Sequence, residues 1–437
     1  MRKIKVAWIC HFSNQQIREK IPLSKLYFSN FLRRLFGMPD IHYRDFAPWI
    51  TSLITEFEML KNVELHIIAP HQGLKQLTAE FEFNGVYFHF FRPNIEYTIS
   101  KFYEKYIPFN KAKFLLSRIL VKQLFKVIQP DIVNLVGAEN PYYSITALDI
   151  KTVPVYVLLQ TVLSTPFKDK FNFNPDNYQI EVENRILKSK MYFGTASRMY
   201  HDCVLSKNKG ANVLEFWFPT QRPPFIPVQR IEFDIVLFAS SLSQIKGVED
   251  VIDALSVVKL EIKTVKMNLI GSCNEKYKKY LQNKIIELGL EDNVIFNEYF
   301  PSHSDMFKQV KRSRIAVLPN KLDVVSSTIR EAMFLEIPVV TYITTGTPYL
   351  NKDNQTVLLS EIGDITALAK NIILLLNDSE LHNTIVTNAK NLAVRIFSNS
   401  SIAEKLIEDN SAIVEHFRNS TPIPKTLLFN SDNFPEY

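Results

Sequence analysis

Two carboxylates on either side of a serine-rich segment are the residues of this sequence best suited to chemistry. Asp323 and Glu331 are separated by seven residues, and Ser326, Ser327 and Thr328 stand between them where a helix is expected to begin. Backbone N–H groups and hydroxyls at a helix start can receive an anion. The carboxylates could then accept hydrogen bonds from the hydroxyls of a sugar and of a ribose. A serine-capped helix with a solvated acidic pair is the ordinary alternative and stays open.

A second segment, FASSLSQIKGVEDVIDAL, would suit a phosphate group. A strand is predicted to end near Ala239 and a helix to start near Gly247, so the segment leads into a helix amino terminus. Unpaired N–H groups and a partial positive charge favour an anion there, and Lys246 adds a full charge. The turn also offers three hydroxyl donors, on Ser240, Ser241 and Ser243. A capped helix with a surface lysine explains the same residues without a ligand.

The elements that must position these loops alternate between short apolar strands and longer helical patterns, which is typical of parallel sheets wound with crossover helices. We expect two Rossmann-like domains facing each other across a cleft, with ligands beyond the carboxyl ends of the strands. The predicted strands are 4–10, 63–69, 131–136, 154–159 and 191–196, then 234–240, 265–271, 293–297, 314–319 and 338–342.

The expected domains follow from this order and from chain length. The sequence has 437 residues, which suits two cores rather than one. The proline-rich segment FPTQRPPFIPVQR, which starts at Phe218, has no consistent period and is predicted to connect them. We therefore expect a first domain over 1–220, a second over 221–410, and a C-terminal segment over 411–437 that packs back on the first.

Composition excludes several classes of protein. With 46% hydrophobic and 22% charged residues, the chain is expected to fold rather than remain disordered. The apolar run near the amino terminus is too short for a secretory signal or a membrane span. Cys10, Cys203 and Cys273 are far apart and lack partners at ligand spacing, so neither a disulfide framework nor a zinc site is predicted. The cytoplasm is the expected compartment.

Positive charge is concentrated in the first half, where the first 220 residues carry roughly +9 against roughly −3 for the remainder. Two stretches, LSKLYFSNFLRRLFG from Leu23 and KAKFLLSRILVKQLFKVI from Lys111, place Lys and Arg among large apolar residues at roughly helical spacing. They predict either docking at the anionic inner face of a membrane or amphipathic core helices with solvated cations. No nucleic-acid recognition module is present, so nucleic acid is not expected as a partner.

Together, the two loops and TTGTPYL from Thr344 resemble the donor half of the group 1 retaining glycosyltransferases, which have the GT-B fold. The most specific part is the acidic pair followed by Ala332 and a Pro-Val-Val strand from Pro338. Lys246-Gly247 falls where the family keeps a phosphate-binding lysine. The amino half, through QPDIVNLVGAENPYYS and FAPWITSLITEFEML, is similar to members that build bacterial surface polysaccharides. The resemblance spans nearly all of the chain.

The resemblance implies an enzyme that transfers a sugar from a nucleotide-sugar donor to a glycan or lipid-linked acceptor, with retention of configuration. Lys246 would bind the diphosphate, Asp323 the hydroxyls of the transferred sugar and Glu331 the donor ribose. Lys246 and Asp323 would be the catalytic residues. The remaining donor contacts would come from Ser241 and from the loop of Ser326, Ser327 and Thr328. Catalysis would rest on positioning and on stabilising the departing charge, with no metal ion and no cofactor beyond the nucleotide-sugar co-substrate.

The sequence departs from the family pattern at several positions. Ser240-Ser241-Leu242 stands where the family has Gly-Arg-Leu, which removes one phosphate-binding cation, and Gln160 stands where a histidine is common. On the acceptor side, Arg18, Arg44 and Gln160 are candidate binding residues. His11 and Glu139 are expected at strand ends, where each either contacts substrate or caps a loop. A non-catalytic sugar-nucleotide-binding protein and a nucleotide-sugar epimerase remain alternatives.

Overall fold

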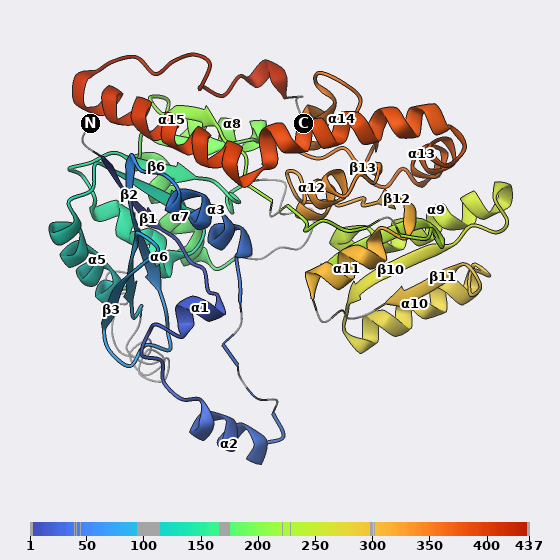
Figure 1. The fold of residues 1–437 in the computed structure, drawn as a ribbon, viewed down its shortest axis with the longest axis horizontal. Helices are drawn as coiled ribbons and strands as arrows, with labels where there is room; N and C mark the ends of the chain where they lie inside the picture. Colours follow the sequence, from blue (N-terminus) through green and yellow to red (C-terminus); the bar gives the residue numbers. More distant parts are fainter. Residues whose placement is uncertain are drawn as a thin grey trace. The chain divides into compact units, whose positions relative to one another are not determined.

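The computed structural model describes residues 3–38, 40, 42–43, 45–93, 114–165, 175–220, 222–227, 229–297, 300 and 302–434, apart from the side chains of residues 28 and 29 (Figure 1). The chain divides into two compact units. Unit 1 contains residues 1–195, 200–218 and 402–429, and unit 2 contains 196–199, 219–401 and 430–437. Each unit is an α/β domain around a sheet that is parallel in unit 2 and parallel except for one edge strand in unit 1, so the predicted fold class is confirmed.

Unit 1 is built on an eight-stranded sheet in the order β3-β4-β2-β1-β5-β6-β7-β8. Strands β1, β2, β5 and β6 are almost completely buried, as expected for a parallel sheet covered on both faces. The strands are β1 (Ile4–Ile9), β2 (Val63–Pro70), β3 (Thr78–Phe83), β4 (Val86–Phe91), β5 (Ile132–Val136), β6 (Val155–Leu158), β7 (Tyr192–Thr195) and β8 (Asn212–Glu215).

Helices connect these strands and supply the apolar side chains that cover the sheet. In α5, for example, Leu120, Val121 and Leu124 are buried on one side of the helix. The helices are α1 (Gln15–Arg18), α2 (Tyr27–Leu35), α3 (Pro48–Glu58), α5 (Leu115–Ile128), α6 (Pro141–Ser144), the 3₁₀ helix η2 (Ile145–Asp149), α7 (Asn177–Ser189) and α8 (Arg198–Lys207).

A hairpin at one edge of this sheet was not predicted from the sequence. Strands β3 and β4 pair antiparallel, with Phe83 opposite Val86, and are joined by Asn84 and Gly85. Both joining residues have positive φ, 52° and 78°, which a tight hairpin turn requires and which Asn and Gly adopt at low cost. The Asn-Gly pair between alternating strands was therefore a usable signal. Strands β8 and β14, of four residues each, were also missed.

Unit 2 has a six-stranded parallel sheet in the order β11-β10-β9-β12-β13-β14. The strands are β9 (Phe233–Ser241), β10 (Met267–Ser272), β11 (Val294–Asn297), β12 (Ser313–Val317), β13 (Val339–Tyr342) and β14 (Val357–Ser360). The helices are η4 (Gln244–Lys246), α9 (Val248–Glu261), α10 (Glu275–Glu287), α11 (His303–Val310), α12 (Ser327–Phe334), η5 (Thr347–Asn351), α13 (Ile365–Asn377), α14 (Ser379–Phe397) and η6 (Ser431–Asn433).

The long helix α15 (Asn399–Asn419) carries the chain back to unit 1. Its buried Asp409 accepts a hydrogen bond from the hydroxyl of Tyr156 at 2.8 Å, and Arg418 forms an ion pair with Asp131 at 2.5 Å. The chain then pairs with β8 through the bridge between Leu214 and Leu428. The sequence analysis placed the end of the second domain at residue 410, whereas the units change at residue 401, inside α15.

The two basic stretches of the sequence form different kinds of helix. The described part of the second stretch forms α5, which packs its apolar side on the core, as the core-helix interpretation requires. The first forms α2, where Tyr27, Phe31 and Leu35 are 78%, 58% and 65% exposed, so the core-helix interpretation is wrong there. Among the described residues, no helix is both long enough and apolar enough to span a membrane.

Candidate functional site

The loop after β9 brings Lys246 to the end of the unit 2 sheet. Strand β9 is buried up to Ala239 and exposed at Ser240 and Ser241, after which the chain enters η4. Gly247 then adopts φ +68° and precedes α9. A Cβ at Gly247 would lie 2.3 Å from the carbonyl oxygen of Pro319, so only glycine allows this loop to pack against the loop after β12.

Lys246 and Asp323 form a direct ion pair between these two loops. The Nζ of Lys246 lies 2.6 Å from Oδ2 of Asp323, and the two side chains are 30% and 42% exposed. From the sequence, each residue was expected to bind a different part of a ligand, and their direct contact was not predicted. Exposed ion pairs contribute little to stability. Both groups can therefore exchange this partner for a ligand at small cost.

A second ion pair, which sequence reasoning missed, fixes the same two loops. Lys321 contacts Oδ1 of Asp250 at 2.7 Å, and the hydroxyl of Tyr342 donates to Oδ2 of Asp250 at 2.7 Å. The backbone N–H of Lys321 also donates to the carbonyl of Ile245. Asp250 lies in the first turn of α9, so its charge, which would repel an anion there, is neutralised by Lys321. No local sequence pattern indicates this network, because its members are up to 92 residues apart.

The serine segment begins α12, as predicted. Ser326 is the N-cap residue, and its hydroxyl accepts from the N–H of Ile329 at 3.4 Å and from Nδ2 of Asn320 at 2.7 Å. Its hydroxyl also lies 3.0 Å from that of Thr328. The Ser326 side chain is thus occupied by the fold. Ser327 is exposed, and the first N–H groups of a helix have no intrahelical acceptor, so they are the groups left for an anion.

Glu331 lies in the second turn of α12, beside the largely buried Arg330. Burial raises the pKa of Glu331 to about 7, against a smaller lowering effect of Arg330. Burial lowers the pKa of Arg330 to about 10, and the charges of Glu331 and Asp323 oppose that shift. Both predicted carboxylates therefore lie within electrostatic range of one guanidinium group. Arg330 was not among the predicted site residues, because nothing in its position along the chain distinguishes it from a surface arginine.

Arg330 is held by groups from distant parts of unit 2. Its Nη1 donates to the carbonyl of Pro219 at 3.4 Å, and its Nε lies 3.5 Å from the carbonyl of Ser326. The centre of the guanidinium group is 5.5 Å from the ring centroid of Phe397, within the range of a cation–π contact. These contacts fix a positive charge next to Glu331.

The TTGTPYL segment completes the site from the end of β13. The hydroxyl of Thr344 donates to the carbonyl of Val324 at 2.7 Å, and a Cβ on Gly346 would lie 2.4 Å from Cγ1 of Val324. The segment thus packs on the residue that follows Asp323. The hydroxyl of Thr345 is buried and has no hydrogen-bond partner among the described residues. The loops after β9, β12 and β13 are therefore bound to one another at the carboxyl edge of the sheet.

The predicted acceptor residues of unit 1 are less clearly arranged as a site. Arg18 donates to the hydroxyl of Ser13 at 2.7 Å and pairs with Asp45 at 2.7 Å, so the fold already uses its guanidinium group. Gln160 is exposed directly after β6. Arg44 lies outside the described residues.

A histidine pair lies near the end of β1. Nδ1 of His11 lies 2.5 Å from the hydroxyl of Tyr142, and burial together with the charge of His71 lowers the pKa of His11 to about 4. Burial and the charge of Arg18 lower the pKa of His71 to about 4 as well. Both rings are therefore neutral at physiological pH. Glu139 lies against Gly137, which has a positive φ. A Cβ added at Gly137 would lie 2.7 Å from both carboxylate oxygens of Glu139.

In the described part of the chain, no group of three or more His, Cys, Asp or Glu residues is arranged to bind a metal ion. The predicted site residues of unit 2 instead combine one exposed cation, two carboxylates and a helix amino terminus. This set can bind a ligand that carries both phosphate groups and hydroxyls.

Two α/β domains, each with loops gathered at the carboxyl ends of parallel strands, give this chain the GT-B fold. The solved structures agree. Sucrose-phosphate synthase from Thermosynechococcus elongatus matches with a TM-score of 0.63 at 14% identity, over 93% of this chain and 98% of that chain. Anabaena HepE in complex with UDP and glucose matches with a TM-score of 0.61 at 17% identity, over 94% of this chain and all (100%) of that chain.

Residues 225–392 match the family model described as glycosyl transferases group 1, so this region is a group 1 glycosyltransferase domain. A curated relative is the capsular polysaccharide biosynthesis glycosyltransferase CapM of Staphylococcus aureus, which is 26% identical over 172 residues. That alignment covers 39% of this chain and 44% of the relative, so the chain spans less than half of CapM. The family prediction is confirmed for this domain.

Proposed function

We propose that this chain is a glycosyltransferase that moves a sugar from a nucleotide-sugar donor to a glycan or lipid-linked acceptor with retention of anomeric configuration. The observation that carries the proposal is the convergence of three loops of unit 2, in which Lys246 and Asp323 are paired beside the start of α12. The name of CapM supports an acceptor in surface-polysaccharide biosynthesis. HepE, whose structure contains UDP and glucose, supports a uridine nucleotide as the first donor to test.

The Lys246–Asp323 ion pair is the resting state of the site in this proposal. When the donor enters, the ammonium group of Lys246 turns to the diphosphate, and the Asp323 carboxylate accepts hydrogen bonds from the hydroxyls of the transferred sugar. Charge-assisted hydrogen bonds to phosphate are stronger than an exposed ion pair. The exchange is therefore favourable. The N–H groups of Ser327 and Thr328 at the start of α12 then bind the phosphate oxygens.

Glu331 binds the donor ribose, with Arg330 fixing its charge state. A carboxylate that accepts two ribose hydroxyl hydrogen bonds must be ionised, and burial opposes ionisation. The neighbouring guanidinium group lowers that cost. Ribose binding lowers it further, because hydrogen bonds to the charged form favour that form.

The transfer step breaks the bond between the anomeric carbon and the terminal phosphate oxygen of the donor. The bond electrons leave with the nucleoside diphosphate, whose new negative charge is balanced by Lys246 and the N–H groups of α12. The acceptor hydroxyl attacks from the face that the phosphate leaves, and its proton passes to the departing phosphate oxygen. The new glycosidic bond then has the configuration of the donor.

The test is nucleotide binding followed by product analysis. A panel of nucleoside diphosphates and nucleotide sugars is screened for thermal stabilisation of the wild-type chain and of Glu331→Ala. Glu336→Ala is the matched control, because Glu336 lies in the same unit and is exposed in an ion pair with Lys390. We expect one nucleotide to stabilise the wild type and the control but not Glu331→Ala.

Turnover assays separate the alternatives. Donor hydrolysis and glycosyl transfer without change of anomeric configuration are the expected result. Donor binding without either reaction would identify a degenerate sugar-nucleotide-binding protein. Conversion of the donor sugar to an epimer in the absence of acceptor would identify an epimerase. If no nucleotide stabilises the folded wild type, the donor site is wrong.

A further inference from the structure

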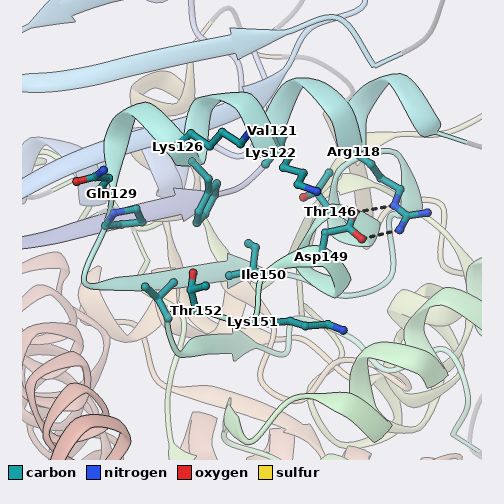
Figure 2. Close-up of a pocket in the computed structure, with 13 residues that line it drawn as sticks. Arg118, Val121, Lys122, Lys126, Gln129, Thr146, Asp149, Ile150, Lys151 and Thr152 are labelled. Atoms are coloured by element: carbon teal, nitrogen blue, oxygen red, sulfur yellow. Dashed lines mark hydrogen bonds and ion pairs between the residues drawn. The ribbon is translucent and has the colours of Figure 1, made fainter.

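A basic pocket in unit 1 lies on the opposite edge of its sheet from the strand ends considered above. The pocket has a volume of about 620 Å³ and is formed by α5, η2 and the segment that leads into β6. Figure 2 shows α5 along one wall and Lys151 and Thr152 along the opposite wall. Gln129 and Pro130 line it just before β5 begins, and Thr152 and Val153 just before β6. It therefore opens at the amino ends of these strands.

The charges around the pocket are unbalanced. Its cationic side chains are Arg118, Lys122, Lys126 and Lys151, and Asp149 is the only carboxylate among the described residues that line it. Asp149 is paired with Arg118, whose Nε and Nη2 donate to the two carboxylate oxygens at 2.7 Å and 2.5 Å (Figure 2). Within the described residues, the three lysines form no ion pair. An anion in the pocket would relieve their mutual repulsion.

A further cation is buried behind the pocket wall. Lys190 donates from Nζ to the carbonyl of Ile150 at 2.8 Å. Burial lowers the pKa of Lys190 to about 8, with Asp149 opposing the shift and Lys151 adding to it. A lysine that is costly to ionise thus lies within electrostatic range of Lys151, one of the pocket lysines. An anion would offset that cost as well.

The walls between the cations are apolar. Val121, Pro130 and Ile150 are buried, and Phe125 is partly buried beside them. A volume of this size with apolar walls and a few polar groups is typical of a small-molecule site. The best complement is a phosphate group joined to an apolar body.

Helix electrostatics explain only part of this arrangement. Lys126 lies in the last turn of α5, where a cation stabilises the helix carboxyl end with no ligand needed. Lys122 lies in the preceding turn, and Lys151 lies outside any helix, on the facing wall. Their convergence on one cavity is not accounted for by the helix dipole.

We propose that this pocket binds the phosphate group of an amphiphilic ligand, either a lipid headgroup or a soluble phosphorylated metabolite. The donor loops belong to unit 2 and share no residue with the pocket. In parallel sheets, substrates bind beyond the carboxyl ends of the strands, so a ligand at the opposite edge is a tether or an effector and not a substrate. The proposal stands independently of the proposed transfer reaction.

The experiment compares the full chain with Lys122→Gln/Lys151→Gln and with the control Lys188→Gln/Lys207→Gln. The control removes two lysines of unit 1 from the last turns of α7 and α8, so net charge changes equally. Calorimetric titration with inorganic pyrophosphate and with hexyl phosphate tests a soluble source. Flotation with phosphatidylcholine vesicles, with and without phosphatidylglycerol, tests a lipid source.

We expect the pocket variant to bind its probe about tenfold more weakly than the wild type and the control, an effect that decreases with added salt. Loss of hexyl phosphate binding assigns a soluble phosphorylated ligand, and loss confined to anionic vesicles assigns a lipid headgroup. The proposal is wrong if neither probe binds the wild type, or if the control loses as much affinity as the pocket variant. Unchanged nucleotide binding by the pocket variant separates this result from the fate of the donor site.

Discussion

The strand ends of unit 2 and those of unit 1 use their polar side chains differently. In unit 2, buried contacts such as Lys321 with Asp250 hold the loops together, which leaves Lys246 and Asp323 exposed in a pair that a ligand can replace. In unit 1, the comparable groups are already engaged, since His11 contacts Tyr142 and Arg18 contacts Ser13.

The difference separates two ways of building a binding site. In unit 2 the groups that hold the loops are distinct from the groups offered to a ligand, so the geometry is preorganised before the ligand arrives. In unit 1 the same side chains would have to hold the loops together and also contact the ligand. We therefore expect substitutions in unit 2 to affect either stability or binding, and those in unit 1 to affect both weakly.

The largest expected effect concerns the support of the unit 2 loops. Gly247→Ala places a Cβ 2.3 Å from the carbonyl oxygen of Pro319 at φ +68°. We expect a loss of about 3 kcal/mol in the free energy of unfolding, because backbone strain and overpacking add. Gly289→Ala is the control, since φ is +63° there but no atom lies within 4 Å of the new Cβ.

Urea denaturation measures this difference. The control is expected to lose only about 1 kcal/mol, the cost of a left-handed backbone conformation without a clash. Equal losses of unfolding free energy for Gly247→Ala and Gly289→Ala would show that the contact between the loops after β9 and β12 does not contribute to stability. Unit 2 would then lack the separate supporting contacts that distinguish it from unit 1.

The second effect separates binding from stability within the same loops. Lys246→Gln is expected to weaken nucleotide binding by about 2 kcal/mol, roughly 30-fold, because a charged hydrogen bond to phosphate is lost. Unfolding free energy should change by less than about 1 kcal/mol, since the pair with Asp323 is exposed. Lys390→Gln removes a similarly exposed ion pair, with Glu336, and should leave nucleotide affinity unchanged in isothermal titration.

The third effect is the pH dependence that Glu331 gives to the donor site. Because burial raises the pKa of Glu331 to about 7, the carboxyl is mostly protonated one unit below that value. Nucleotide affinity should therefore fall up to about tenfold between about pH 8 and about pH 6. Protonation of the nucleotide phosphate also changes the affinity in this pH range. The Glu331→Gln variant, which lacks the carboxyl group, measures that phosphate contribution alone. A wild type and variant with parallel pH profiles would exclude Glu331 from the site.

Stability should respond to the same carboxyl with the opposite sign. The folded chain holds the Glu331 proton more tightly than the unfolded chain, whose pKa is near the ordinary value of 4.5. As pH rises from about 4.5 to about 7, the unfolded state loses its proton first, so this group lowers stability progressively. The Glu331→Gln variant has no carboxyl group to titrate and does not lose this stability. The difference between its melting temperature and that of the wild type should therefore grow as the pH rises from about 4.5 to about 7.

The sequence predicted those parts of the fold and site that are local. Every strand predicted from a buried apolar run is present, and Ser326 caps α12 where the serine segment suggested. These signals lie within one strand or one turn, where periodicity and capping chemistry act directly.

Long-range contacts could not be predicted in the same way. Nothing in the local sequence indicates that Lys246 pairs with Asp323, 77 positions away, or that Arg330 reaches the carbonyl of Pro219. Such pairs depend on which strands are neighbours in the sheet, here β9 and β12. The candidate site residues could be predicted from the sequence, whereas the residues that they contact could be identified only from the structure.

The smallest expected effect tests whether unit 1 contributes to binding at all. Gln160 is exposed after β6 and forms no side-chain hydrogen bond within the described residues, so of the two predicted acceptor residues that the structure describes it is the one less engaged by the fold. Once donor and acceptor are identified, Gln160→Ala is expected to raise the acceptor KM about threefold, the value of one neutral hydrogen bond, with donor affinity and melting temperature unchanged. Gln123→Ala, also exposed, is the control. An unchanged acceptor KM would remove Gln160 from the site, and acceptor recognition would then have to use side chains that also hold the fold of unit 1 together.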